Sequence, residues 1–268
     1  MFAKLFKHEF LATWRLLATV VGVIFLVSCT FLLLAVFDVP VLSQVGVVFA
    51  FIGFVSVGGV VPILLAVQYW RTMYGPPGYL THSLPVRGRL VFAAKVVYMC
   101  VMSVAGMAVA VAAAFGLPYL ATRGTSMAAF FDDVFPPIAK LLHVGQLWTL
   151  LLVPVYVCAL CVQYLCGLTL GTRGRLHRLG AGGAVIGLVA VYLTSQLVSV
   201  AALVTLPWGM RVSGPQVGTY TAQSMGVDIF RGATPGVLGM GWLPLAVLLA
   251  ALLTLAAVRS VEHHTSLR

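Results

Sequence analysis

Residues 16–37 read LLATVVGVIFLVSCTFLLLAVF and contain no charged side chain. A helix of about 20 apolar residues crosses the roughly 30 Å hydrocarbon core of a bilayer, and it satisfies its own backbone polar groups there. The rest of the chain has the same character, because 61% of its 268 residues are apolar and only 8% are charged. A soluble protein of this length needs far more charge to cover its surface. The composition therefore predicts an integral membrane protein and excludes soluble enzymes and soluble DNA-binding proteins.

Six apolar stretches of this kind divide the chain, and we expect each to be a transmembrane helix. They cover residues 16–37, 45–67, 96–120, 145–170, 181–206 and 242–258. Six crossings put both termini on one side of the bilayer. The sequence therefore predicts an all-α, multi-pass integral membrane protein of the cell (cytoplasmic) membrane, with a single transmembrane domain over residues 1–268.

The loops on the two sides of the predicted membrane differ in charge. One set holds twelve basic and two acidic residues: Lys4, Lys7, Arg15, Arg71, Arg87, Arg89, Lys95, Arg173, Arg175, Arg178, Arg259 and Arg268, with Glu9 and Glu262. The other set holds four of each: Arg123, Lys140, Arg211 and Arg231, with Asp38, Asp132, Asp133 and Asp228. The whole formal net charge of +10 lies on the first side. The positive-inside rule makes that side, and both termini, cytoplasmic.

The segment before the first span, residues 2–15, reads FAKLFKHEFLATWR. It combines basic residues with apolar residues at helical spacing, and the apolar ones are Phe2, Leu5, Phe6, Phe10 and Trp14. This pattern predicts an interfacial amphipathic helix on the cytoplasmic leaflet, with its rings in the headgroup boundary and its lysines near anionic lipid. An ordinary basic anchor for the first span is the alternative.

The longest predicted cytoplasmic loop covers residues 68–95, and its centre, residues 74–86, reads YGPPGYLTHSLPV. Its glycines and prolines predict a sharp turn, followed by a short element of one or two helical turns that ends at Pro85. The apolar side chains that this element presents outside the membrane are Tyr79, Leu80, Leu84 and Val86. Exposed apolar residues on a short rigid element indicate docking to another protein. Packing against the chain's own helix ends is the alternative.

Three features together resemble the permease subunit of an ATP-binding-cassette (ABC) type 2 exporter: the basic amphipathic start, six spans with both ends inside, and the loop after the second span. In that family the loop contains a glycine, a Gly-Tyr-Leu, a Leu-Pro and a downstream lysine. The matching residues here are Gly75, Gly78, Tyr79, Leu80, Leu84, Pro85 and Lys95. Many relatives carry acidic residues between the two glycines, where this chain has Pro76 and Pro77. Polar contact with an ATPase at this point would then fall to Arg87 or Arg89.

The resemblance implies that this loop is a short cytoplasmic coupling helix between spans two and three, which fits a groove on a separate ATPase subunit. The implied coupling residues are Tyr74, Gly75, Gly78, Tyr79, Leu80, Thr81, His82, Ser83, Leu84 and Pro85. The implied partners are ABC ATPase subunits, a second permease chain (identical or paralogous) and membrane lipid, with no nucleic acid. The chain has no G-x-x-x-x-G-K-[ST] phosphate-binding loop, so we expect no cofactor in it and assign ATP and Mg²⁺ to the ATPase.

Two kinds of residue stand out inside the predicted spans. Small residues at helical spacing predict close helix packing, within the chain or between subunits; they are Gly106, Ala110, Ala114, Gly183 and Gly187. Polar and small residues of the second and fifth spans would line the transport path if the resemblance holds; they are Ser56, Gly58, Tyr192, Gln196 and Ser199. Hydrogen bonding between helices, unrelated to any substrate, is the alternative for this second group.

The predicted spans contain no ionisable Asp, Glu, Lys or Arg in their interiors, and Asp38 and Lys95 stand at span ends. We therefore predict neither a metal site nor catalytic residues, which weakens the case for a membrane enzyme. Export of an amphiphilic substrate, such as a drug, an antimicrobial peptide or a lipid-like molecule, fits a pathway without fixed charges. A non-transporting membrane scaffold or assembly factor is the alternative. Residues 207–241 are too few for a separate receptor domain and are expected to form an external or re-entrant helix.

Overall fold

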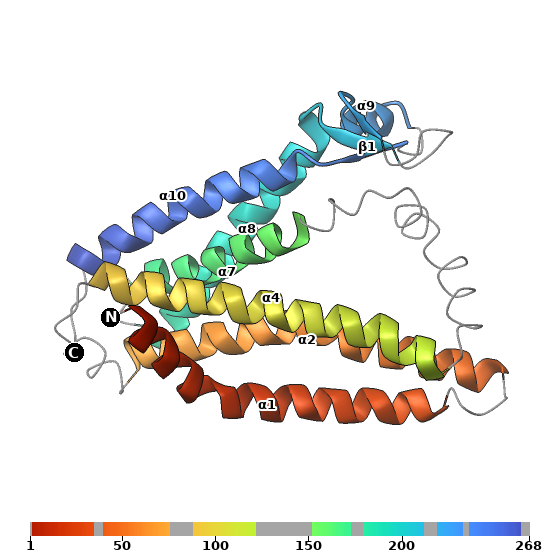
Figure 1. The fold of residues 1–268 in the computed structure, drawn as a ribbon. Helices are drawn as coiled ribbons and strands as arrows, with labels where there is room; N and C mark the ends of the chain where they lie inside the picture. Colours follow the sequence, from red (N-terminus) through yellow and green to blue (C-terminus); the bar gives the residue numbers. More distant parts are fainter. Residues whose placement is uncertain are drawn as a thin grey trace. The chain divides into compact units, whose positions relative to one another are not determined.

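The computed structural model of the chain describes residues 2–34, 40–75, 88–121, 152–172, 179–211, 219–232 and 236–263. Its long helices are α1 (Phe2–Leu34), α2 (Pro40–Tyr74), α4 (Gly88–Ala121), α7 (Leu152–Gly171), α8 (Ala181–Thr205) and α10 (Trp242–His263) (Figure 1). All six are long and apolar enough to cross a membrane. The prediction of six long apolar helices is therefore confirmed, whereas the side of the membrane on which the termini lie stays a prediction.

The chain divides into two compact units, Met1–Val134 and Phe135–Arg268. In the first unit α1, α2 and α4 pack against one another, and Figure 1 shows them side by side in red, orange and yellow. At one end of this unit lies an aromatic core around Phe54, whose side chain is fully buried. Phe25 meets Phe54 edge to face with 5.2 Å between ring centroids, and Phe51 meets Phe115 in the same way at 5.8 Å. Such ring pairs stabilise the helix contacts beyond the area that they bury.

Small residues set the spacing between α2 and α4. A Cβ atom at Gly106 would lie 3.1 Å from a methyl group of Val61, and one at Gly58 would lie 3.1 Å from the sulfur of Met107. Ala110 and Ala114 are buried on the same face of α4. The predicted small-residue face of this helix is therefore confirmed, and its partner is α2 of the same chain.

In the second unit α7 crosses α8 at glycines. A Cβ atom at Gly167 would lie 3.0 Å from the Cα of Leu188, and one at Gly171 would lie 2.9 Å from the Cα of Gly187. Only glycine allows two helix backbones to come this close. α10 packs against both helices, and the side-chain amide of Gln163 on α7 donates a hydrogen bond of 3.4 Å to the carbonyl of Ala246 on α10.

A small antiparallel sheet follows α8 in this second unit. Its central strand β1 (Gly209–Arg211) pairs with β2 (Tyr220–Thr221) and β3 (Val237–Gly239), and the short helix α9 (Met225–Phe230) lies between β2 and β3 in sequence. The all-α prediction is wrong here. Strands of two or three residues are too short to leave an alternating pattern in the sequence, so the period-two signal for strands was absent. The short helix agrees with the expected helix in residues 207–241.

The helices extend beyond the predicted spans at the polar end of the first unit. α2 continues through Tyr74 and α4 begins at Gly88, so the predicted loop over residues 68–95 is wrong at both of its ends. Each further helical residue adds one backbone hydrogen bond once the helix exists, so a helix does not need to end where the hydrocarbon ends. Residues 2–15 likewise form one continuous helix with the first span, although α1 bends near its beginning (Figure 1). A separate interfacial helix that ends at residue 15 is not present.

Candidate functional site

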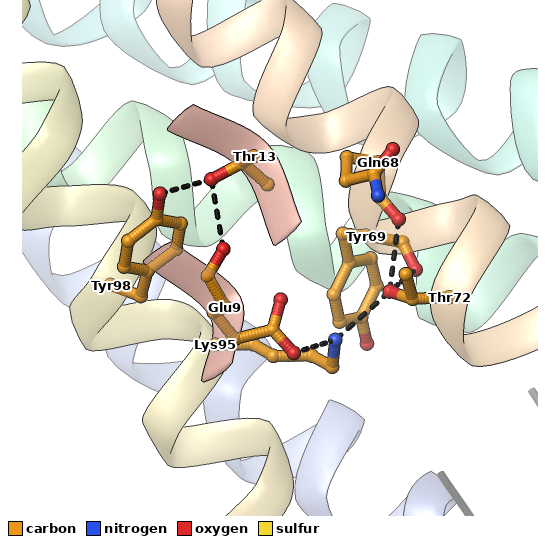
Figure 2. A network of polar contacts seen from close by, with 7 residues as sticks. All are labelled: Glu9, Thr13, Gln68, Tyr69, Thr72, Lys95 and Tyr98. Atoms are coloured by element: carbon orange, nitrogen blue, oxygen red, sulfur yellow. Dashed lines mark hydrogen bonds and ion pairs between the residues drawn. The ribbon is translucent and has the colours of Figure 1, made fainter. Parts of the chain in front are cut away.

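Among the described residues of the first unit, a network of polar side chains lies where α1 begins, α2 ends and α4 begins. Figure 2 shows seven residues from these three helices that form one network. At its centre, Lys95 on α4 and Glu9 on α1 form an ion pair with 2.6 Å between Nζ and Oε1. The side chain of Lys95 is 5% exposed and that of Glu9 is 17% exposed. Because a buried charge is costly unless it is paired, this contact holds the beginning of α1 against α4.

The ammonium group of Lys95 also contacts α2. It donates a second hydrogen bond of 2.9 Å to the hydroxyl of Thr72. That hydroxyl donates in turn to the backbone carbonyls of Gln68 at 2.9 Å and Tyr69 at 3.2 Å, one turn earlier on α2. One lysine side chain therefore joins three helices, and the threonine hydroxyl is both acceptor and donor.

A second link between α1 and α4 lies one turn deeper. The hydroxyl of Thr13 donates to the backbone carbonyl of Glu9 at 2.9 Å, and it also contacts the hydroxyl of Tyr98. With the Thr13 proton directed at the Glu9 carbonyl, the Tyr98 hydroxyl can donate its own proton in the contact with Thr13. Thr13 and Tyr98 are both buried. The two links fix the rotation of α1 about its own axis as well as its distance from α4.

Aromatic rings enclose the network. Phe6 on α1 packs edge to face on Tyr98, with 5.2 Å between ring centroids. Tyr69 on α2 is buried and meets Phe92 on α4 at 6.4 Å. These rings cover part of the network, and hydrogen bonds in such apolar surroundings are stronger and cost more to break.

The sequence positions these side chains by helical spacing. Phe6, Glu9 and Thr13 are separated by three and four residues and therefore share one face of α1. Lys95 and Tyr98 are separated by three residues on α4, and so are Tyr69 and Thr72 on α2. Each helix thus contributes a ring and a polar group to the same end of the unit.

This arrangement is suited to holding helices in a fixed relation, because its polar groups are paired across three helices. It contains one carboxylate and one ammonium group that neutralise each other. Among the residues that the structure describes, no group of three or more His, Cys, Asp or Glu side chains lies close enough to hold a metal ion. A network that connects three helix ends is, however, a suitable device for making them move together.

The network lies directly beside the predicted coupling segment. Tyr74 is the last residue of α2, and the N–H of Gly75 donates a hydrogen bond of 3.1 Å to the carbonyl of Arg71. A side chain at Gly75 would press against that carbonyl, which explains why glycine ends this helix. Eight predicted coupling residues lie outside the described part of the chain: Gly78, Tyr79, Leu80, Thr81, His82, Ser83, Leu84 and Pro85. The helices that enter and leave this segment are the two that Lys95 joins.

The residues proposed to line a path come from both units, Ser56 and Gly58 from the first and Tyr192, Gln196 and Ser199 from the second. Ser56 is exposed on α2 and donates a hydrogen bond of 2.6 Å to the carbonyl of Gly53 in its own helix. Gly58 is buried against α4. On α8, Tyr192 is exposed, while Gln196 and Ser199 are half-buried. Gly58 therefore serves helix packing, and the role of the other four residues stays a prediction.

The sequence reasoning missed the ion pair, although two signals for it were present. Glu9 is the single acidic residue in a basic segment, and Lys95 is the last charged residue before the long apolar part of α4. Each was counted only as a loop charge on the cytoplasmic side. Their pairing depends on the contact between α1 and α4, and a separation of 86 positions gives no local signal of that contact.

Comparison of the chain with protein-family models, with curated proteins and with solved structures finds no match. The function must therefore be argued from the residues themselves.

Proposed function

We propose that this protein is the transmembrane permease subunit of an ABC type 2 exporter, which forms half of a translocation pathway and is driven by a separate ATPase subunit. Four features support the proposal: six helices long and apolar enough to cross a membrane, a net charge confined to one set of loops, the coupling-like sequence of residues 74–85, and the network beside it. The substrate is an amphiphilic molecule such as a drug, an antimicrobial peptide or a lipid-like compound.

The observation that carries the proposal is the place of the ion pair. Residues 76–87 connect α2 to α4, and Lys95 ties α4 to Thr72 of α2 and to Glu9 of α1. A loop that only tethers two helices does not need its flanks to be fixed to each other. A loop that receives a push from an ATPase needs its two flanking helices to be fixed to each other. Otherwise the push would displace one helix end and would not reach the rest of the unit. The buried pair supplies that stiffness, since separating it would leave a buried charge without its partner.

In this proposal each part of the chain has a distinct role. The ATPase binds and hydrolyses ATP with Mg²⁺ and contacts the coupling segment. The Glu9–Lys95–Thr72 contacts convert displacement of that segment into a joint movement of α1, α2 and α4. The apolar packing between Gly58 and Met107, and between Gly106 and Val61, carries the movement further along α2 and α4.

A second permease chain remains part of the proposal, but one argument for it no longer holds. The small-residue faces predicted to allow subunit contact are used inside the chain, where they pack α2 on α4 and α7 on α8. The expectation of two permease chains therefore rests on the resemblance and on the argument that six helices without fixed charge in their predicted spans offer half of a pathway.

The proposal is tested by co-purification with the ATPase encoded by a neighbouring gene that contains a phosphate-binding loop. Tyr79→Ala combined with Leu84→Ala should weaken the association tenfold or more, because an interface anchor contributes about 1–2 kcal/mol and each 1.4 kcal/mol is a factor of ten. The matched control is Tyr220→Ala combined with Leu238→Ala, which removes an exposed tyrosine and an exposed leucine from the sheet.

The two double variants separate the possible roles of the loop. Both should insert into the membrane normally, because neither pair lies within a predicted span. Loss of the ATPase in the loop variant alone supports the exporter proposal. If the loop variant inserts, keeps its ATPase and still transports, residues 76–87 are a tether and the proposal loses its main support. A chain that has no ATPase partner at all would favour the scaffold alternative.

A further inference from the structure

An apolar patch lies where α8 ends in the second unit. Its members are Trp208, Val227, Ile229 and Phe230, and all four are exposed large apolar side chains. Phe230 is 86% exposed, far more than an aromatic ring usually is in a folded protein. Three of the four lie on a helix of six residues, and apolar side chains exposed at this density mark an interaction surface.

The contact between α9 and α8 fixes the depth of this patch. A Cβ atom at Gly226 on α9 would lie 2.8 Å from a methyl group of Val204, so α9 rests directly on this residue of α8. Val204 is eleven residues beyond Leu193, the midpoint of α8. At 1.5 Å per residue this is about 16 Å along the helix axis, and half of the hydrocarbon core is about 15 Å thick. α9 therefore lies at the boundary between hydrocarbon and headgroups when α8 is centred in the bilayer.

The patch also continues the lipid-facing side of α8. Leu193, Leu197, Val200 and Val204 follow one another at intervals of four, three and four residues, so they form one stripe along the helix. The first three are strongly exposed, and Leu197 is 72% exposed. Within the described part of the second unit these side chains are uncovered, so the stripe is free to face lipid. Because α9 sits on the last member of the stripe, its own exposed residues extend the same surface outward.

The polar groups of α9 fit a position at the headgroups. The carboxylate of Asp228 accepts a hydrogen bond of 3.1 Å from the N–H of Gly236, which holds the acidic group against the following loop. Arg231, the residue that ends the helix, is exposed beside Phe230. Exposed apolar side chains with a cation at the end of the helix are the composition found at the membrane interface.

We propose that α9 and Trp208 form a membrane-interface anchor, in which Phe230, Ile229 and Val227 insert into the headgroup boundary of the leaflet where α8 ends and Arg231 contacts lipid phosphate. The occupant of the patch is thus the lipid surface. The anchor holds the small sheet at a fixed depth beside the ends of α8 and α10. It does not depend on the exporter proposal, because it rests on α8, α9 and Trp208 alone.

The anchor is tested by photo-crosslinking of the full chain in vesicles of phosphatidylethanolamine and phosphatidylglycerol. The photoreactive residue p-benzoylphenylalanine is placed at position 230, where it preserves the aromatic ring, or at position 223 as a control. Gln223 is an exposed polar residue two positions before α9. Benzophenone inserts into nearby C–H bonds and does not react permanently with water, so mass spectrometry of the adducts reports what surrounds each position.

The expected result is a lipid adduct at position 230 that is at least fivefold more abundant than at position 223. Equal or absent lipid adducts at the two positions would show that the patch faces water and would overturn the proposal. A protein adduct at position 230, from a second copy of the chain, would overturn it as well. Because p-benzoylphenylalanine retains a phenyl ring, a folding defect is not expected, and circular dichroism of both labelled chains confirms it.

Discussion

Removing one member of the Glu9–Lys95 pair should release the beginning of α1 from α4, while removing both should not. In Glu9→Leu the ammonium of Lys95 stays at 5% exposure without its carboxylate and keeps Thr72 as a hydrogen-bond acceptor. Breaking a buried pair in this way costs about 3–5 kcal/mol. Detachment of α1 lets water reach Lys95, so this cost appears as an easier opening of α1.

The opposite variant should have a smaller effect. In Lys95→Met the carboxylate of Glu9 is unpaired but 17% exposed, so it recovers part of its hydration without any detachment. We expect a cost of about 1–3 kcal/mol, typical of a polar group left unsatisfied. The double variant Glu9→Leu with Lys95→Met contains neither charge, and similar apolar volume replaces both, so its stability should be within about 1 kcal/mol of the unmodified chain.

Hydrogen exchange of backbone amides in residues 3–15, measured by mass spectrometry on the chain in nanodiscs, reports this local opening. Each 1.4 kcal/mol in the free energy of opening changes the exchange rate by a factor of ten. Exchange should therefore be about 100-fold or more faster than in the unmodified chain in Glu9→Leu and about tenfold faster in Lys95→Met. In the double variant it should lie within about fivefold of the unmodified chain. Lys7→Met removes an exposed charge from the same helix and should leave exchange unchanged. If both single variants exchange like the unmodified chain, or if the double variant exchanges faster than either, the ion pair does not hold α1 and the reasoning is refuted.

Two further predictions concern the second unit and the topology. Gly171→Ala should lower the free energy of unfolding in an SDS titration by about 1–3 kcal/mol, because the new methyl group overpacks against Gly187. Gly182→Ala is the control and should be neutral or stabilising, since the nearest neighbour of its Cβ would be the Cβ of Leu179 at 3.8 Å. Equal effects of the two substitutions would contradict the close crossing of α7 and α8. Reporter fusions after Arg87 and Arg178 should be cytoplasmic and fusions near Asp133 and Gln216 external; the reverse pattern would disprove the assignment made from the loop charges.

The sequence predicted the parts of the fold that depend on local composition. Six apolar stretches became six long helices, and the spacing of Gly183 and Gly187 indicated the close crossing that α8 makes with α7. The helix ends near Tyr74 and Gly88 were placed wrongly, because hydropathy marks where lipid ends and carries no information on where backbone hydrogen bonding ends. The strands of the small sheet were missed, because their pairing joins segments of two or three residues that are distant in sequence.

The sequence predicted the segment beside the candidate site but not the residues that form the site. The turn that begins at Gly75 was predicted from its glycine, which acts through the local backbone, and the loop that follows lies outside the described residues. Glu9 and Thr72 were not predicted as members of the site, because nothing in the sequence near either residue indicates that Lys95 lies between them. To predict a buried network of this kind, the packing of three helices must be known first. A turn can be predicted from its own residues alone.

The lengths of the helices add an argument for the direction in which the first unit projects. α1, α2 and α4 contain 33, 35 and 34 residues, so each is about 50 Å long, roughly 20 Å more than the hydrocarbon core. Helical residues 2–15, 68–74 and 88–95 lie outside the predicted spans at the end that holds Glu9, Thr72 and Lys95, so most of the excess length lies at this end. The α7 and α8 helices, with 20 and 25 residues, leave almost no such excess. Helices that project beyond a bilayer must hold one another without help from surrounding lipid, and the polar network at this end does so. The exporter proposal requires this end of the unit to withstand a push from a soluble partner, and helix ends that are joined in this way have the stiffness to do so.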